Sequence, residues 1–317
     1  MKLHSFVKRI PFFVIFLIVS IQIVLINFYQ NNYTKTLPTS ILSQTPSLSR
    51  TTARNFTLSL TPPTKSNIKL ALTSLSSQSV LVKNLNDNST LYEKNASNKM
   101  YIASITKLMT AATALSNISP DLVVRTDSSS VSIVDSYVKL PDNTDYSLID
   151  LLYALLLPSS NQAAYTFANN LGYNNFINKM NSIAKALELE DSYFINPAGF
   201  DDQINTNGKK ITNQSSARDV AVLTKYILQN KQILEIIKTK NKVISSTNGQ
   251  NIKLTNTNEL LDLIPGVIGV KTGTENLAGQ CLDLAYVKDG NTYIIIILNS
   301  TDRYADARQI IQSINAL

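Results

Sequence analysis

The sequence predicts an α+β domain whose antiparallel sheet is assembled from both ends of the globular part, around a helical subdomain. Two alternating segments within residues 68–85 predict the first strands, and apolar helical runs fill the middle of the chain. Three further strand-like segments and a last helix follow from residue 266 onward. Because strands come first and last with helices between them, one sheet has to draw on both ends.

The first two strands are predicted from "IKLALTSL" at 68–75 and "SVLVKNL" at 79–85. Apolar and polar residues alternate in both segments, which is typical of half-buried strands. We predict that they pair as a hairpin that turns around Ser76 to Gln78. A helical segment then begins near Ser104, within "YIASITKLMT".

Four more helices are predicted from apolar residues that recur at helical spacing. They cover residues 148–157, 160–171, 174–188 and 216–230. The last of them opens with "SSARD" at 215–219, where a serine can cap the helix N-terminus.

The three closing strands are predicted at 266–273 ("GVIGVKTG"), 280–288 ("QCLDLAYVK") and 291–300 ("NTYIIIILNS"). Asp289 and Gly290 between the last two predict a tight hairpin, since this dipeptide favours the required turn. A final helix is predicted at 303–316.

The composition narrows the chemistry that this chain can perform. With 44% hydrophobic residues among 317, the chain can bury a substantial core. Its single cysteine, Cys281, cannot form an intrachain disulfide. Its only histidine, His4, precedes an N-terminal apolar run, which excludes Ser-His-Asp catalysis and histidine-ligated zinc from the rest of the chain. A nucleophile here needs another base, and lysine is the obvious candidate.

The net charge of +7 comes entirely from the first 65 residues, which hold seven basic residues and no acid. The remaining residues carry 22 basic and 22 acidic side chains and are formally neutral. A basic arm of this kind does not make a nucleic-acid surface on the folded part, so we expect no nucleic-acid partner.

The N-terminal region predicts a membrane attachment. Residues 10–28 are nineteen uncharged, largely apolar residues, preceded by the basic segment 1–9. This length nearly spans a bilayer core, and the positive-inside rule places the N-terminus in the cytoplasm. A cleaved signal peptide is the alternative interpretation, although the run is long and lacks an A-x-A-like site. We expect 29–65 to be a flexible polar linker and 66–317 to be the extracytoplasmic catalytic domain.

Three short motifs carry the candidate chemistry. They are Ser104-Ile105-Thr106-Lys107, Ser159-Ser160-Asn161 and Lys271-Thr272-Gly273. Each has an ordinary structural explanation when taken alone: a helix cap, a capping turn and the end of a strand. The first spacing also recurs elsewhere, for example at Ser182 and Lys185. The order of the three motifs is therefore more informative than any one of them.

S-x-x-K, S-x-N and K-T-G in this order resemble the signature of penicillin-binding proteins and serine β-lactamases. Further segments resemble the D-alanyl-D-alanine carboxypeptidase family of low-molecular-mass penicillin-binding proteins. They are "ASITKLMT", "NPAGF" at 196–200, "SSARD", "NTNELL" at 256–261, "GVKTG", "AGQCL" at 278–282 and "DRYADA" at 302–307. The resemblance covers residues 66–317 and implies the penicillin-binding protein/β-lactamase-like transpeptidase fold.

The resemblance implies a division of labour among the motif residues. Ser104 would attack the substrate, and Lys107 would take its proton, provided that its surroundings keep it partly neutral. Repulsion from a second lysine, Lys271, would favour that neutral form. Ser159 would relay the proton to the leaving amine, and Asn161 would hold the substrate backbone.

The remaining site residues implied by the resemblance bind the substrate. The backbone N–H groups of Ser104 and Thr274 would form the oxyanion hole, and Gly273 would let the strand approach the ligand closely. The terminal carboxylate would be met by three side chains, Lys271, Thr272 and Arg303. For Arg303, a solvated place in the first turn of the last helix is an equal alternative.

Three positions depart from the family pattern: Gln162 replaces a common acid, Glu275 follows the oxyanion position, and Ala198 replaces a frequent polar residue. They leave the substrate preference open. A β-lactamase is less favoured because no E-x-x-L-N-like element lies between the second and third motifs. A catalytically silent wall-binding protein is a further alternative, although all three motifs are complete.

We therefore expect a membrane-tethered serine peptidase that removes the terminal D-alanine from peptidoglycan stem pentapeptides. β-Lactam antibiotics would acylate the same serine, and neither a metal nor an organic cofactor is implied. Transfer to another stem peptide (transpeptidase) or cleavage of a crosslink (endopeptidase) would use the same residues. The chain stops soon after the last predicted helix, so we expect no additional C-terminal β domain.

Overall fold

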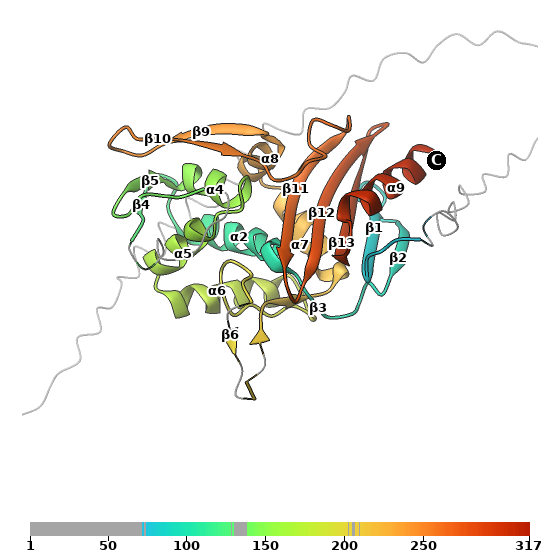
Figure 1. The fold of residues 1–317 in the computed structure, drawn as a ribbon, viewed down its shortest axis with the longest axis horizontal. Helices are drawn as coiled ribbons and strands as arrows, with labels where there is room; N and C mark the ends of the chain where they lie inside the picture. The colour runs from blue at the N-terminus through green and yellow to red at the C-terminus, as the bar shows by residue number, and fades with distance from the viewer. Residues whose placement is uncertain are drawn as a thin grey trace, which may run out of the picture. The chain divides into compact units, whose positions relative to one another are not determined.

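A five-stranded antiparallel sheet runs through the structure, with the strand order β11-β12-β13-β1-β2 (Figure 1). The computed structural model describes residues 72, 74–127, 129, 138–201, 203–204, 207–208 and 210–317. The strands are β1 (Ser79–Asn84), β2 (Thr90–Lys94), β11 (Val267–Glu275), β12 (Gly279–Lys288) and β13 (Asn291–Ser300). β1 pairs with β13 from Ser79 opposite Leu298 to Asn84 opposite Tyr293. The prediction that one sheet draws on both ends of the globular part is confirmed.

The central strand β13 is apolar on both sides because both faces of the sheet are covered. Ile294 and Ile296 belong to the core on the side of the main helices. Ile295 and Ile297 belong to a second core that includes helix α9 (Arg303–Asn315). Since successive side chains of a strand point to opposite faces, a run of isoleucines fills both cores at once.

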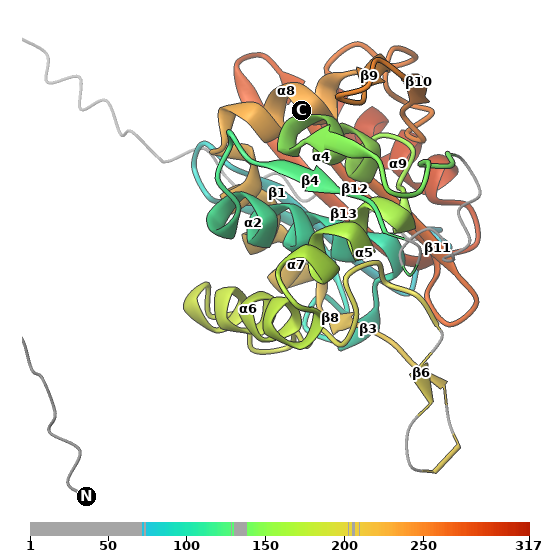
Figure 2. The same cartoon turned by 90° about the vertical axis from the view of Figure 1, so that its left-hand side faces the viewer.

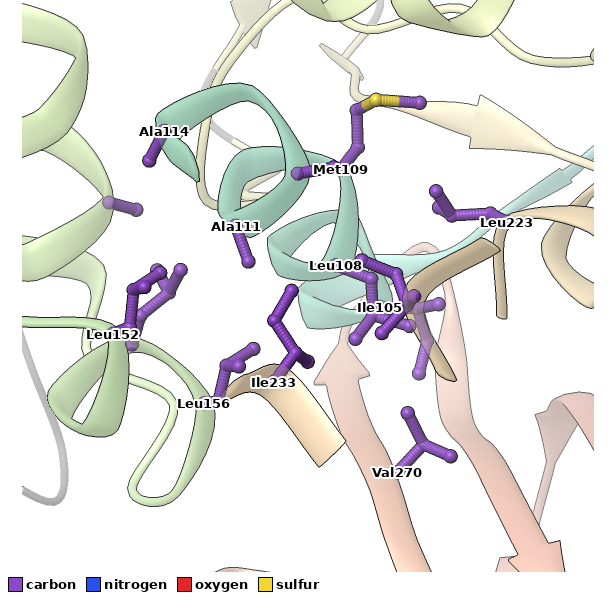
Figure 3. Close-up of a cluster of buried hydrophobic side chains, with 14 of the residues drawn as sticks. Ile105, Leu108, Met109, Ala111, Ala114, Leu152, Leu156, Leu223, Ile233 and Val270 are labelled. Atoms are coloured by element: carbon purple, nitrogen blue, oxygen red, sulfur yellow. The ribbon is translucent and has the colours of Figure 1, made fainter. Parts of the chain in front are cut away.

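The main helices surround α2 (Lys107–Asn117), which lies between the sheet and the helical subdomain (Figures 1 and 2). Its neighbours are α4 (Leu148–Leu156), α5 (Asn161–Asn170), α6 (Tyr173–Ala186), α7 (Ala217–Leu228) and α8 (Lys231–Lys238). Leu108 and Ala111 of α2 lie among Leu152 of α4, Ile233 of α8 and Val270 of β11 (Figure 3). This packing fixes the helix that follows Ser104 against the strand that carries the K-T-G motif.

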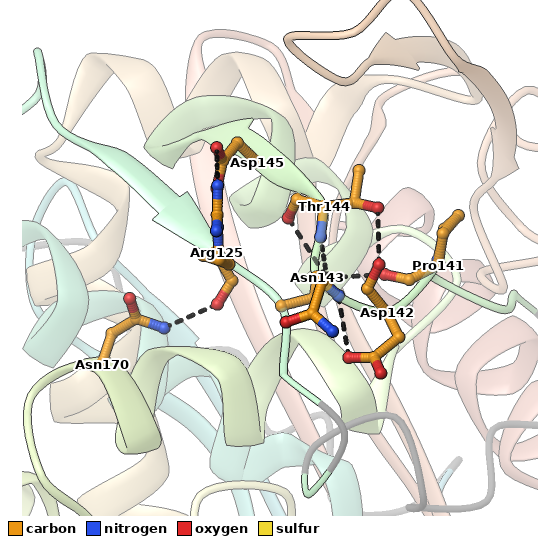
Figure 4. A network of polar contacts seen from close by, with 8 residues as sticks. Arg125, Pro141, Asp142, Asn143, Thr144, Asp145 and Asn170 are labelled. Atoms are coloured by element: carbon orange, nitrogen blue, oxygen red, sulfur yellow. Dashed lines mark hydrogen bonds and ion pairs between the residues drawn. The ribbon is translucent and has the colours of Figure 1, made fainter.

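A small polar corner holds the start of α4 and the end of α5 together (Figure 4). Strands β4 (Val123–Arg125) and β5 (Asp145–Ser147) pair there. The Arg125 guanidinium donates to both oxygens of Asp145, each at 2.7 Å, and the Arg125 carbonyl accepts from Asn170 Nδ2 at 2.9 Å. This ion pair is largely exposed, so its main effect is geometric.

One predicted hairpin is wrong. Residues 76–78 do not form a turn between strands, because both Ser76 and Ser77 donate their backbone N–H groups to the Asp306 carboxylate of α9. The hairpin instead joins β1 to β2, through a turn that includes Asn88 at a φ of 61°. The part of the predicted first strand at 68–71 lies outside the described residues.

The other predicted elements are confirmed, with small differences at their ends. The hairpin at Asp289 and Gly290 has φ values of 49° and 76°, as a two-residue turn of this kind requires. Sequence analysis missed α8, the β4–β5 pair and the hairpin of β9 (Asn241–Ser245) and β10 (Asn251–Thr255). It also missed four two-residue strands: β3 (Met100–Tyr101), β6 (Gln203–Ile204), β7 (Lys210–Ile211) and β8 (Gln214–Ser215).

The predicted N-terminal anchor at 10–28 and linker at 29–65 lie outside the described residues. Within the part of the chain that the structure describes, no helix is both long and apolar enough to span a membrane.

Candidate active site

Ser104 lies in a single 3₁₀ turn, Ala103–Thr106 (η2), which leads directly into α2. Residues three apart eclipse one another in a 3₁₀ turn, so Lys107 lies directly beside Ser104. The distance from Lys107 Nζ to Ser104 Oγ is 2.8 Å. The predicted pairing of these two side chains is confirmed.

The Lys107 side chain is completely buried, and its amine is held from three sides. Besides Ser104 Oγ, Nζ contacts Asn161 Oδ1 at 2.7 Å and the Ala198 carbonyl oxygen at 3.0 Å. The last two can only accept, whereas the serine hydroxyl can accept or donate. An ammonium can therefore donate to all three, and a neutral amine can donate to two and accept the proton of Ser104. The same geometry suits both protonation states.

The "NPAGF" segment positions the carbonyl that contacts Lys107. Asn196 Oδ1 accepts from the backbone N–H groups of Ala198, Gly199 and Phe200, at 3.1, 2.6 and 3.3 Å. Thr110 of α2 donates to the Pro197 carbonyl at 2.5 Å and fixes the segment to the helix. Ala198, where relatives often have a polar residue, takes part through its backbone, so its side-chain identity leaves the contact intact.

The S-x-N motif lies at the start of α5. Ser160 caps this helix by accepting from the Ala163 N–H at 3.1 Å, and Ser159 precedes it at a φ of 65°. Asn161 is the first residue of the helix and reaches Lys107. Gln162, one of the departures noted above, is buried and accepts from the Leu140 backbone N–H at 2.7 Å. This departure therefore has a structural role.

The K-T-G motif lies on β11, the edge strand of the sheet, against the 3₁₀ turn. A β-carbon on Gly273 would lie 3.0 Å from the Ser104 backbone nitrogen and 3.1 Å from Ala103 Cβ. The strand therefore approaches the turn as closely as a glycine allows.

Lys271 is almost fully buried on this strand, and its Nζ donates to the Thr272 carbonyl at 2.9 Å. Burial lowers the pKa of Lys271 well below its ordinary value, and the positive charges of Lys107 and Arg303 lower it further. The repulsion between the two motif lysines that the resemblance implied therefore acts on Lys271.

Arg303 is the first residue of α9, but its side chain lies on the sheet edge. Its Nη1 donates to the Gly273 carbonyl at 2.6 Å and to the Cys281 carbonyl at 3.1 Å. Its Nε is buried and has no hydrogen-bond partner among the described residues. The solvated alternative for this arginine is therefore wrong.

A cleft of about 550 Å³ joins these elements. Seven of the predicted site residues line it: Ser104, Ser159, Asn161, Thr272, Gly273, Thr274 and Arg303. Lys107 and Lys271 lie buried behind the surface of the cleft. Nine further lining residues were not among the predicted site residues, and they include Phe200, Lys253, Thr257, Glu259 and Tyr304. Three of these five belong to the "NPAGF" and "NTNELL" segments, whose resemblance to the family was the available signal.

Thr257 holds two walls of the cleft together. Its backbone N–H donates to the Leu157 carbonyl at 3.0 Å, next to the S-x-N loop. Its hydroxyl lies 2.7 Å from the Thr272 hydroxyl of the K-T-G motif. Tyr304 of α9 donates to the Thr257 carbonyl at 2.9 Å. The "NTNELL" segment therefore sets the distance between the second and third motifs.

The D-alanyl-D-alanine carboxypeptidase family model (peptidase S11) matches residues 65–302, which include all three motifs. This chain belongs to that family. The match ends one residue before Arg303. The members compared below differ in the reactions that their names give.

The chain is 32% identical over 243 residues to a D-alanyl-D-alanine carboxypeptidase of Streptomyces sp. strain K15, covering 70% of this chain and 81% of that protein. It is 30% identical to the D-alanyl-D-alanine endopeptidase of Escherichia coli K12, covering 74% and 76%. It is 29% identical to the carboxypeptidase DacF of Bacillus subtilis over 66% of this chain, and it spans about half (53%) of that protein.

The crystal structure of the Streptomyces K15 DD-transpeptidase superposes with a TM-score of 0.70 at 30% identity, covering 77% of this chain and 98% of that one. The predicted penicillin-binding protein-like fold is confirmed.

Proposed function

We propose that this chain is a serine peptidase that removes the terminal D-alanine from peptidoglycan stem peptides through an acyl-enzyme on Ser104. The observation that carries the proposal is the 2.8 Å contact between Ser104 Oγ and the buried amine of Lys107, beside an open cleft. The names of two relatives, a D-alanyl-D-alanine carboxypeptidase and a D-alanyl-D-alanine endopeptidase, both describe chemistry at a D-alanyl bond.

Acylation begins from neutral Lys107. Its amine accepts the Ser104 proton while Oγ forms a bond to the carbonyl carbon of the penultimate D-alanine. The two hydrogens of the Lys107 amine remain hydrogen-bonded to Asn161 Oδ1 and the Ala198 carbonyl, so the base keeps its orientation. The backbone N–H groups of Ser104 and Thr274 would stabilise the negative oxygen of the tetrahedral intermediate.

Collapse of that intermediate breaks the bond to the terminal D-alanine, whose nitrogen takes up a proton relayed through Ser159. Water then attacks the Ser104 ester, and the proton that it loses returns to the serine oxygen as the peptide leaves. Lys271, Thr272 and Arg303 would bind the terminal carboxylate before cleavage, because a guanidinium and a hydroxyl line the cleft there and the Lys271 amine lies behind its surface.

Two further parts of the proposal concern location. Residues 10–28 would anchor the protein in the membrane, with 1–9 in the cytoplasm, 29–65 as a linker and 66–317 outside. The catalytic domain would then act on the cell wall from the outer face of the membrane. β-Lactams would acylate Ser104 because their reactive carbonyl resembles the D-alanyl-D-alanine bond.

The test is the intact mass of the full-length protein after incubation with benzylpenicillin. We expect a gain of one penicillin, absent in S104A. S182A is the matched control, because Ser182 also precedes a lysine by three residues but is exposed on α6 and bonds the Asn178 carbonyl. Unmodified protein with intact drug would contradict the proposal, and unmodified protein with hydrolysed drug would indicate a β-lactamase. Release of D-alanine from a pentapeptide then distinguishes a carboxypeptidase from a transpeptidase or endopeptidase.

A further inference from the structure

Glu275 lies two residues after Gly273 on strand β11 and can reach a substrate in the cleft. The pairing of β11 with β12 is regular from Val270 to Glu275, so Lys271, Gly273 and Glu275 share one face of the strand. Gly273 touches the turn that carries Ser104, and Glu275 therefore lies about 7 Å further along the strand edge. Its side chain is half-buried and lines the cleft.

The opposite end of the cleft is fixed by the contact between Thr257 and Thr272. If the terminal carboxylate of the substrate binds at that end, the preceding residues run along β11 toward Glu275. This direction rests on the proposed function. An extended peptide advances by about 3.3 Å per residue, as the strand does. The residue that precedes the two D-alanines therefore passes close to Glu275.

The charges in the cleft give Glu275 a specific task. Arg303 and Lys253 place two basic side chains along the same cleft. A peptide that carries a protonated amine is repelled by these groups unless an acid lies near its own charge. Phe200 also lines the cleft and offers an apolar surface to the aliphatic part of a long side chain.

We propose that Glu275 selects stem peptides in which the residue before the D-alanyl-D-alanine end carries a free, protonated side-chain amine. The carboxylate accepts charge-assisted hydrogen bonds from that ammonium, and partial burial strengthens them relative to a surface pair. Glu275 is thus a specificity-determining residue, distinct from the groups that break the bond.

The test compares two peptides, Nα-acetyl-L-Lys-D-Ala-D-Ala and its Nα,Nε-diacetyl form, with the full-length protein. They differ only in the charged amine, and D-alanine release gives kcat/KM for each. We expect the free-amine peptide to be preferred by about fivefold or more, and the preference to fall to within about twofold in E275Q. E259Q is the matched control, since Glu259 is exposed at the other end of the same cleft and should leave the ratio unchanged.

An equal preference in wild type and E275Q, or no preference in wild type, would overturn the inference. Failure of both peptides to release D-alanine would refute the carboxypeptidase reaction instead. In that case the preference is measured by how strongly each peptide slows acylation by benzylpenicillin, because this inhibition reports binding to the same cleft. A loss of preference in E259Q equal to that in E275Q would also overturn the inference, because it would indicate a general field effect.

Discussion

A β-carbon on Gly199 would lie 2.0 Å from the carbonyl oxygen of Ala103, the residue before the candidate nucleophile. Gly199 also has a φ of 90°, which other residues rarely adopt. The loop that presents the Ala198 carbonyl to Lys107 is thus seated directly on the turn that carries Ser104. The two parts of the site cannot be displaced independently.

G199A should therefore move both parts. We expect acylation by benzylpenicillin to slow by about 100-fold, because a misplaced nucleophile of this kind costs about that much, and the melting temperature to fall. G249A is the control: Gly249 has a similar φ of 85°, but a β-carbon there would meet no atom of the described residues within 4 Å. Equal effects of the two substitutions on acylation would contradict this account.

Replacing Lys107 should remove the base while leaving the serine in place. We expect K107Q to lower the acylation rate constant by about 10³-fold, within the range usual for general bases. K185Q, at the exposed lysine of the other Ser-x-x-Lys spacing on α6, should acylate at the wild-type rate. The measurement is stopped-flow acylation with a chromogenic β-lactam. A K107Q rate within about tenfold of wild type would exclude Lys107 as the base.

Lys271 should weaken the fold at neutral pH. The pKa of Lys271 is lowered in the folded protein. At pH values between this lowered pKa and 10.5, the unfolded chain binds more protons than the folded protein does. The free energy of unfolding therefore rises with pH in this range. K271M should remove this dependence, raise the free energy of unfolding at pH 7 by about 1 kcal/mol or more, and impair acylation. Urea unfolding at several pH values measures the free energy of unfolding of both proteins. A K271M variant that is less stable than wild type at pH 7 would contradict the prediction.

Asp283 should have the opposite pH dependence. It is fully buried on β12, Thr224 lies 2.5 Å from its Oδ2, and Oδ1 has no partner among the described residues. The Thr224 hydroxyl has one hydrogen, which it donates to the Val220 carbonyl at 2.7 Å. Its contact with Asp283 is then a hydrogen bond in which Asp283 is protonated and donates. Burial raises the pKa of Asp283 to about 8.

The stability contributed by protonated Asp283 is complete below pH 3.8 and is lost as the pH rises to about 8. D283N should remove this loss, which amounts to roughly 1.4 kcal/mol per pH unit within the window. The variant should therefore gain on wild type as the pH increases. An unchanged pH dependence in D283N, measured by urea unfolding, would show that Asp283 is already ionised in the folded protein.

Thr257 should matter for both walls of the cleft. T257V keeps the shape of the side chain but removes the hydroxyl that meets Thr272, so we expect a loss of about 1 kcal/mol in stability. Acylation should also slow, since the K-T-G strand loses a fixed point relative to the S-x-N loop. T255V, at an exposed lining residue of β10, is the control. Similar slowing in both variants would contradict the bridging role.

Sequence reasoning succeeded where the signal is local or carried by a motif. The spacing of Ser104 and Lys107 placed them on one helix face, and the order of the three motifs distinguished them from the same spacing at Ser182 and Lys185. Asp289 with Gly290 was sufficient to place a hairpin. The predicted turn at Ser76 to Gln78 was wrong because the backbone of Ser76 donates to Asp306. This partner lies 230 residues away, and no local sequence pattern indicates it. Arg303 was ambiguous for the same reason, since its partners lie on β11 and β12.

The pairing of β1 with β13 also decides when this protein can fold. β13 is the central strand of the sheet, and it is synthesised more than 200 residues after β1. An emerging chain therefore cannot complete the sheet until nearly all of it has been made, and contacts of such long range form slowly. The catalytic cleft, one wall of which is β11 in the same sheet, is absent until then. A growing chain would therefore lack peptidase activity throughout most of its synthesis.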